Sequence, residues 1–314
     1  MRLLKSKELL SKFIDKINNP KEITIALPES NSRIYDSKKI LSDIGINIIS
    51  ADDIHRYKID ALPIINKLKF SENWSEDDLV AYSNAPFIKS LLMLKENKIS
   101  AVVCGSEMPS SEVIRGGLRI IGLKKAVKNL TSMFLMINES KNHFITFSDC
   151  AVIPDPTSEQ LAEIAYQSGS MHRELMGDQP KVAFLSFSTK GSADHYRVKN
   201  VQKAVDIFER KYHDIEFEGE IQADAALDSI VAEKKIKNSI LKGDANTLIF
   251  PNLDAGNIGY KLVQRLGSYY ACGPLLLGLD KPLNDLSRGA SVDDIVLIAL
   301  LTAIQAQGRD NANI

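Results

Sequence analysis

The 314-residue sequence has only three cysteines, Cys104, Cys150 and Cys272, and no two of them form a Cys-x-x-Cys motif. Disulfide-rich domains and zinc sites need numerous or closely spaced cysteines. The five histidines are also scattered, and His195, the only one near a candidate motif, is interpreted as a surface residue. The sequence therefore predicts no disulfide framework, no metal site and a reducing, cytoplasmic location.

Net charge and long apolar runs are lacking as well. Lys plus Arg total 39 and Asp plus Glu total 40, which gives a net charge of −1. Proteins that bind nucleic acid or anionic membranes usually carry excess positive charge. The apolar run 295–304 is about half a membrane span, and charges interrupt residues 1–10 too early for a signal peptide. We expect a soluble protein whose partners are small molecules.

Short apolar segments alternate with helix-like segments along the whole chain. This alternation predicts an α/β fold with largely parallel sheets. A chain of 314 residues with 44% hydrophobic content exceeds the size at which one core usually splits, so two domains are expected. The predicted strands are 22–27, 46–49, 101–104, 132–137, 144–147, 182–187, 247–250 and 270–277.

The segment 281–294 places Ser287, Arg288 and Asp294 within eight positions. An arginine grips an anionic group in a fixed geometry, and a carboxylate can accept a proton. The set therefore favours chemistry on an anionic substrate. Ser291 and Asp294, three positions apart and just before an apolar run, also fit a helix capping box with Asp in place of Glu. Capping and catalysis remain alternatives for Asp294 at this point.

A polar loop, Ser188-Thr-Lys-Gly-Ser-Ala193, joins the predicted strand 182–187 to an amphipathic helix. Free backbone amides and the positive end of the helix dipole would favour a phosphate there, and Gly191 would allow close approach. Lys190 adds a positive charge. The loop lacks the Walker pattern, so an ordinary turn is the alternative interpretation.

A second loop rich in Pro, Asn, Asp and Gly follows the predicted strand 247–250 and opens a helix that stops at Gly267. Lys261 and Arg265 share one face of this helix. Its apolar residues, on one face, are Tyr260, Leu262, Val263 and Leu266.

Four blocks resemble the phosphate acetyltransferase/butyryltransferase family in type, order and spacing: 188–193, 251–261, Gly273-Pro274 and 285–289. Further family-like blocks are 148–152 with 156–165, and 105–122, which contains Arg115. The resemblance is strong over residues 101–306 and looser through Leu27-Pro-Glu-Ser30 and Arg33.

The resemblance implies reversible transfer of an acetyl group between coenzyme A and phosphate, with coenzyme A as a substrate, no prosthetic group, no metal and a homodimer. It implies Asp294 as the base, Ser287 as a substrate-orienting residue, and Arg288 and Arg115 as phosphate ligands. The substrate-binding residues assigned on the same basis are Ser188, Thr189, Lys190, Gly191, Asn252, Asn257, Tyr260, Lys261 and Arg265.

The same resemblance implies an isocitrate/isopropylmalate dehydrogenase-like fold with an active-site cleft between two α/β domains. The first domain would comprise residues 1–133 plus 275–314, and the second residues 134–274.

The chain departs from the family pattern at three places. Ala290 stands where Cys is usual after Ser-Arg-Gly, Ile153 stands where Asn is usual, and an expected upstream arginine has no match. The segment 81–98 offers Lys89, Lys95 and Lys98 instead. Alternatives are a butyryltransferase for longer acyl chains, a non-catalytic acyl-CoA-sensing domain, and a metal-dependent decarboxylating dehydrogenase, whose clustered acidic ligands and nucleotide site the motifs do not resemble.

Overall fold

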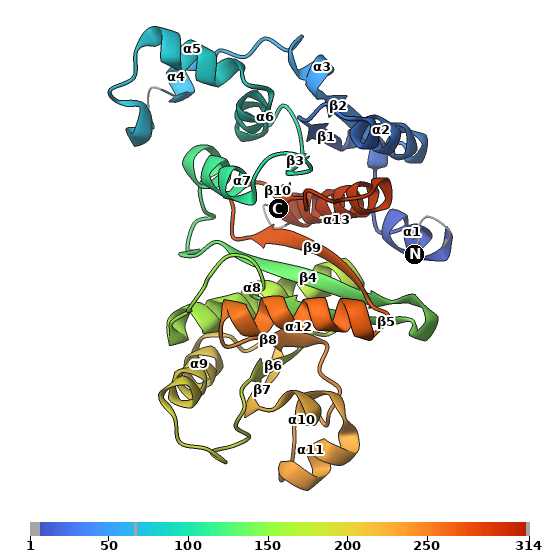
Figure 1. Cartoon of the computed structure of the whole chain (residues 1–314), viewed down its shortest axis with the longest axis vertical. Helices are drawn as coiled ribbons and strands as arrows, with labels where there is room; N and C mark the ends of the chain where they lie inside the picture. The colour runs from blue at the N-terminus through green and yellow to red at the C-terminus, as the bar shows by residue number, and fades with distance from the viewer. Residues whose placement is uncertain (1–6, 66–67, 312–314) are drawn as a thin grey trace. The chain divides into compact units, whose positions relative to one another are not determined.

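The computed structural model describes residues 7–65 and 68–311, so residues 1–6 of the N-terminal segment considered above lie outside it. The chain forms two compact units (Figure 1). Unit 1 comprises residues 1–128 and 279–314, and unit 2 comprises residues 129–278. The predicted boundaries at 133/134 and 274/275 would cut two strands that lie entirely within unit 2.

Unit 1 contains a parallel four-stranded sheet in the order β10-β3-β1-β2. Helices α13 and α2 pack against each other and against the sheet, and α6 also contacts β3. Positions 295–306 of α13 are buried, which explains the apolar run seen in the sequence. The strands are β1 (Thr24–Leu27), β2 (Asn47–Ser50), β3 (Ala101–Cys104) and β10 (Leu283–Asp285). The helices are α1 (Lys7–Ile14), α2 (Ser32–Ile44), α3 (Ala51–Ile54), α4 (Leu62–Ile65), α5 (Glu76–Asn84), α6 (Pro86–Lys95), α7 (Ser110–Gly116) and α13 (Val292–Asn311).

Unit 2 contains a mixed six-stranded sheet in the order β7-β6-β8-β5-β4-β9. Its first four strands are mutually parallel, whereas β4 runs antiparallel to both β5 and β9. The strands are β4 (Thr131–Asn138), β5 (His143–Ser148), β6 (Lys181–Leu185), β7 (Glu216–Ile221), β8 (Thr247–Ile249) and β9 (Tyr270–Leu277). The helices are α8 (Ser158–Met176), α9 (Tyr196–Lys211), α10 (Ala223–Leu227), α11 (Ser229–Lys235) and α12 (Leu253–Leu266).

Two hydrophobic cores cover the two faces of the unit 2 sheet. Val182 and Phe184 of β6 pack with α8 and α9, whereas Ala183 and Leu185 pack with α10, α11 and α12. The division follows from the strand geometry, since successive side chains point to opposite faces. Both faces are therefore buried, as expected for parallel strands flanked by helices.

The prediction of an α/β protein with mostly parallel sheets is confirmed, and all eight predicted strands are present with ends shifted by a few residues. Two strands, β7 and β10, were missed. β7 has the sequence Glu-Phe-Glu-Gly-Glu-Ile, in which Glu218 and Glu220 are buried. Because its buried positions are charged, the sequence shows no apolar strand pattern there. β10 has only three residues, one of them the buried Asn284, and forms no apolar run.

Candidate active site

The residues predicted to act chemically follow β10 at one edge of the unit 1 sheet. Strands β1, β3 and β10 are parallel, so their carboxyl ends lie at the same edge. Loops at this edge are the usual place for ligand sites in α/β sheets. The loop 286–291 leaves β10 here, and the loop 105–109 leaves β3 beside it.

Ser287 and Arg288 are exposed on the loop 286–291, and Asp294 is partly buried in the first turn of α13. The capping-box interpretation of Asp294 is confirmed. Its Oδ2 accepts hydrogen bonds from Ser291 N at 2.6 Å and from Ser291 Oγ at 2.8 Å. Ser291 Oγ in turn accepts from Asp294 N at 3.2 Å. Capping does not exclude catalysis, because a carboxylate has acceptor sites beyond those two bonds.

Asp285, the last residue of β10, is buried immediately before this loop. Its Oδ2 accepts a 2.5 Å hydrogen bond from Ser110 Oγ, and its Oδ1 is buried without a hydrogen-bond partner. Burial raises the pKa of Asp285 to about 6, and the carboxylate of Glu29 adds to the rise, while the Ser110 bond opposes it. Gly105 is required opposite, because a Cβ there would lie 2.2 Å from Asp285 Oδ1.

Arg115 is exposed in the last turn of α7. The first residue of α7 is Ser110, whose hydroxyl bonds Asp285. The helix that carries Arg115 is thus fastened to the strand end that precedes Ser287. The structure joins the two segments that the sequence assigned to phosphate binding.

Two residues at this edge, Glu29 and Arg33, were not predicted as site residues from the sequence. Both follow β1, and Glu29 is buried. Glu29 accepts hydrogen bonds from the β3–α7 loop, and Arg33 donates to carbonyl oxygens of two loops. The only signal was the short Leu27-Pro-Glu-Ser30 block and the arginine after it, because the partners of Glu29 and Arg33 lie 73 to 257 residues away in the sequence.

Two of the three lysines offered in place of the missing upstream arginine form hydrogen bonds within unit 1. Lys89 is buried and its Nζ donates to His55 O at 3.3 Å. Lys95 Nζ donates to Ile120 O at 2.5 Å. Lys98, by contrast, is exposed.

The phosphate-loop interpretation of the loop 188–193 in unit 2 expects free backbone amides. In the structure these amides donate to acceptors within the protein. Gly191 N donates to Glu220 Oε1 at 2.8 Å, and Lys190 N donates to Glu220 O at 3.0 Å. The other amides of the loop donate to Ser186 Oγ, Ser188 Oγ, Thr189 O and Ser192 Oγ.

Side chains of the same loop are engaged too. Ser188 is buried and donates to Glu220 Oε1 at 2.8 Å, and Thr189 Oγ1 donates to Gln222 at 3.3 Å. Lys190 Nζ donates to Gly219 O at 2.8 Å and lies 3.8 Å from Glu218 Oε1. A protein carboxylate, not a free amide array, therefore organises this loop.

The predicted residues of α12 divide into capping, packing and exposed roles. Asn252 caps the helix by accepting from Ala255 N at 3.0 Å, and Asn257 donates to Cys150 O at 3.2 Å. Tyr260 stacks on Phe134 with ring centroids 4.1 Å apart, and burial raises the pKa of its hydroxyl. The remaining two, Lys261 and Arg265, are exposed.

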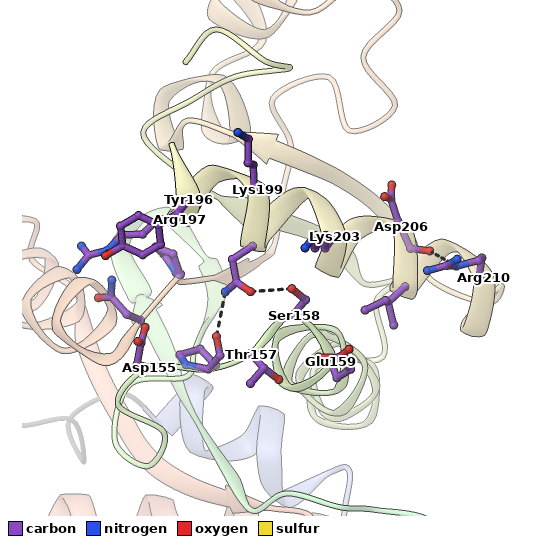
Figure 2. A pocket seen from close by; sticks show the side chains of 15 residues that line it. Asp155, Thr157, Ser158, Glu159, Tyr196, Arg197, Lys199, Lys203, Asp206 and Arg210 are labelled. Atoms are coloured by element: carbon purple, nitrogen blue, oxygen red, sulfur yellow. Dashed lines mark hydrogen bonds between the residues drawn. The ribbon is translucent and has the colours of Figure 1, made fainter. Parts of the chain in front are cut away.

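Unit 2 also holds a pocket of about 770 Å³ between the start of α8 and the length of α9 (Figure 2). Ser158 Oγ and Asn200 form a 2.6 Å hydrogen bond across it. Its charges are mixed, and Asn252 is the predicted site residue that lines it. The charged lining residues are Asp155, Glu159, Arg197, Lys199, Lys203, Asp206 and Arg210.

The cysteine thiols are not suited to act as nucleophiles. All three are free and buried, and burial raises the pKa of the Cys104 and Cys150 thiols well above the usual value. Such thiols are poor nucleophiles. Within residues 7–65 and 68–311, no group of three or more His, Cys, Asp or Glu side chains is arranged to hold a metal ion. No helix in that part of the chain is long and apolar enough to span a bilayer.

Comparison with known proteins matches residues 28–303 to the family described as phosphate acetyl/butaryl transferase. The chain belongs to this family. A relative named phosphate acetyltransferase from Treponema pallidum is 46% identical over 232 residues, which cover 71% of this chain and 69% of that protein.

Two solved structures of proteins named phosphotransacetylase match nearly the whole of this chain. A phosphotransacetylase from Streptococcus pyogenes is 30% identical with a TM-score of 0.87, covering 98% of this chain and 100% of that one. The EutD phosphotransacetylase from Staphylococcus aureus is 33% identical with a TM-score of 0.82, covering 95% and 98%. The family resemblance inferred from the motifs is thereby confirmed.

Proposed function

We propose that this protein catalyses the reversible reaction of acetyl-CoA with phosphate to give acetyl phosphate and coenzyme A. The observation that carries the proposal is the loop 286–291, which presents Ser287 and Arg288 exposed near Asp294. The chain is 46% identical over 232 residues to a protein named phosphate acetyltransferase. The reaction needs one group for an anion, one for a proton and one for orientation. This short segment supplies all three.

In the proposed direction from acetyl phosphate, the thiol of coenzyme A attacks the carbonyl carbon and phosphate leaves. A thiol with a pKa of about 8.5 is mostly protonated at neutral pH, so a base must take its proton. Asp294 is proposed as that base. Arg288 and Arg115 would stabilise negative charge on the phosphate, and Ser287 would donate to the carbonyl oxygen or hold the thiol.

Substrate binding beyond this loop is proposed for residues of unit 2. Lys261 and Arg265 are exposed cations, and Lys190 keeps part of its side chain accessible. The other assigned residues, with roles in holding their loops, are Ser188, Thr189, Gly191, Asn252, Asn257 and Tyr260. Coenzyme A enters as a substrate, and no prosthetic group or metal is proposed. The isocitrate/isopropylmalate dehydrogenase-like assignment, with its interdomain cleft, remains a prediction.

A homodimer in the cytoplasm is the proposed working state. Support comes from α12, where Ile258, Leu262 and Leu266 recur every fourth position and are 56%, 52% and 81% exposed. An exposed apolar stripe of this kind is typical of a contact surface. Light scattering of Leu262→Lys should give a smaller mass than wild type, and an unchanged mass would remove this stripe from the interface.

The test is release of phosphate from acetyl phosphate, measured with and without coenzyme A and followed in parallel by thioester formation. The proposal expects both signals and their dependence on coenzyme A. Butyryl phosphate in the same assay decides between the acetyltransferase and the longer-chain alternative. Binding of acetyl-CoA without turnover would identify a sensing domain, and reduction of a nicotinamide by a hydroxy acid would identify a dehydrogenase.

A further inference from the structure

The chain from the end of β1 to the first turn of α2 contacts the loop 286–291, which carries Arg288, and the β3–α7 loop, which leads into the helix of Arg115. Its first contact is Glu29, whose buried carboxylate receives four backbone amides and one hydroxyl from the β3–α7 loop. The donor–acceptor distances run from 2.7 to 3.1 Å. The donors are Gly105 N, Ser106 N, Ser106 Oγ, Glu107 N and Met108 N. The loop that starts α7 is therefore wrapped around one carboxylate.

The second contact is Arg33, in the first turn of α2. Its Nη1 donates to Ala290 O at 2.7 Å and to Arg288 O at 3.1 Å. Its Nη2 donates to Ser106 O at 3.2 Å. One planar guanidinium thus links the loop after β10 to the loop after β3. Only arginine offers donors in such a rigid fork.

The two carbonyls that accept from Arg33 Nη1 belong to the residues on either side of Gly289. In contrast, the side chains of Ser287 and Arg288 form no hydrogen bond or ion pair with other described residues, and both are exposed. Their directions are therefore set by the backbone of the loop. That backbone is fixed by Arg33 and by the turn bond from Ala290 N to Ser287 O at 2.8 Å.

We propose that Arg33 is a positioning residue that fixes the 286–291 loop so that Arg288 presents its guanidinium in one direction. The proposal rests on the proposed function for its kinetic consequence. Arg33 itself need not touch a substrate. Small displacements of a group that aligns reactants can cost about 10²-fold in rate, so loss of this link should appear mainly in kcat.

The kinetic test compares Arg33→Met and Arg33→Lys with the matched control Arg56→Met. Arg56 is also in unit 1, its side chain is 81% exposed, and its one ion pair, with Asp53, is 3.9 Å long. We expect Arg33→Met to lower kcat by roughly 10²-fold while KM for coenzyme A changes less than about threefold. Arg33→Lys should recover only part of the loss, because one ammonium cannot reproduce the fork. Arg56→Met should match wild type.

A double-mutant cycle separates positioning from general weakening. If Arg33 acts through Arg288, Arg33→Met should cost little further activity in an Arg288→Ala background, since the positioned group is already gone. An equal loss in both backgrounds would overturn the proposal. So would an Arg33→Met enzyme within about threefold of wild type in kcat/KM.

Hydrogen exchange measures the same link without any reaction. Arg33→Met should accelerate amide exchange in peptides covering 286–291 by about tenfold or more, while peptides from α8 exchange as in wild type. Unchanged exchange in 286–291 would overturn the proposal even if activity fell. If wild type lacked phosphate-dependent acyl transfer, the proposed function would fail, and this exchange result would still decide whether Arg33 holds the loop.

Discussion

Replacing Asp294 by Asn separates helix capping from proton transfer, because the substitution retains one function and removes the other. The capping box uses Oδ2 as the acceptor for Ser291 N and Oγ. The amide oxygen of Asn can accept the same two hydrogen bonds. The loss of stability therefore comes mainly from removing the favourable interaction between the carboxylate charge and the positive end of the α13 dipole. That term is typically about 0.3–1 kcal/mol. At the upper end of this range, a loss of about 1 kcal/mol corresponds to a fall in Tm of roughly 2–4 °C.

The catalytic consequence should be far larger. An amide cannot accept the thiol proton, and loss of a positioned base lowers kcat by roughly 10² to 10⁴. Because coenzyme A retains its other contacts, KM should change little. The assay is initial-rate kinetics with coenzyme A and acetyl phosphate, together with thermal unfolding of the same preparation.

Ser291→Ala supplies the matched control, because it breaks the same capping box and leaves the carboxylate in place. It should lower stability by about 1 kcal/mol and leave kcat within about threefold of wild type. The reasoning would be refuted if Asp294→Asn and Ser291→Ala had similar kcat values near that of wild type. Asp294 would then be a cap alone.

Three further predictions concern Arg288, metal dependence and Asp285. Arg288→Ala should reduce kcat/KM by roughly 10²-fold or more, and Arg288→Lys should recover part of the loss. Steady-state kinetics measure both variants. A folded Arg288→Ala enzyme with nearly wild-type kcat/KM would show that Arg288 is not in the site. Enzyme treated with EDTA should turn over at the same rate as untreated enzyme. Loss of turnover after EDTA treatment would contradict a metal-free reaction. The pKa of Asp285 is raised from 3.8 to about 6, so its contribution to stability is full below about pH 4 and is lost as pH rises through 6. Urea unfolding should therefore show that the free energy of unfolding falls on the order of 3 kcal/mol between pH 4 and 7 in wild type, and that Asp285→Asn lacks this fall. The same pH dependence in both proteins would show that the pKa of Asp285 is not shifted.

The parts of the fold that could be predicted are those written in local patterns. Apolar runs located eight strands, and the Ser291–Asp294 spacing located a capping box that the structure confirms. The two missed strands bury polar side chains whose partners come from elsewhere. Asn284 in β10, for example, donates to Thr302 and Gln305 of α13.

The sequence could predict which types of residue form the candidate site, but not which residues hydrogen-bond to one another there. The 188–193 loop was interpreted as free to hold phosphate, because nothing near it in sequence shows that Glu220, 29 residues after Gly191, accepts its amide. Arg33 bonds residues 255 and 257 positions away. Interactions over such separations depend on the strand order, which a single sequence does not reveal.

The order in which the chain is synthesised has a consequence for how unit 1 is completed. Unit 2 is one continuous stretch, 129–278, whereas unit 1 needs residues from both sides of it. Domains generally fold as units during synthesis, so unit 2 can form while unit 1 still lacks β10 and α13. Until those elements arrive, β3 has an unpaired edge and α2 an uncovered apolar face. The last elements to join are the ones that bring Ser287, Arg288 and Asp294, so a nascent chain is exposed to misassociation before it carries any of these groups.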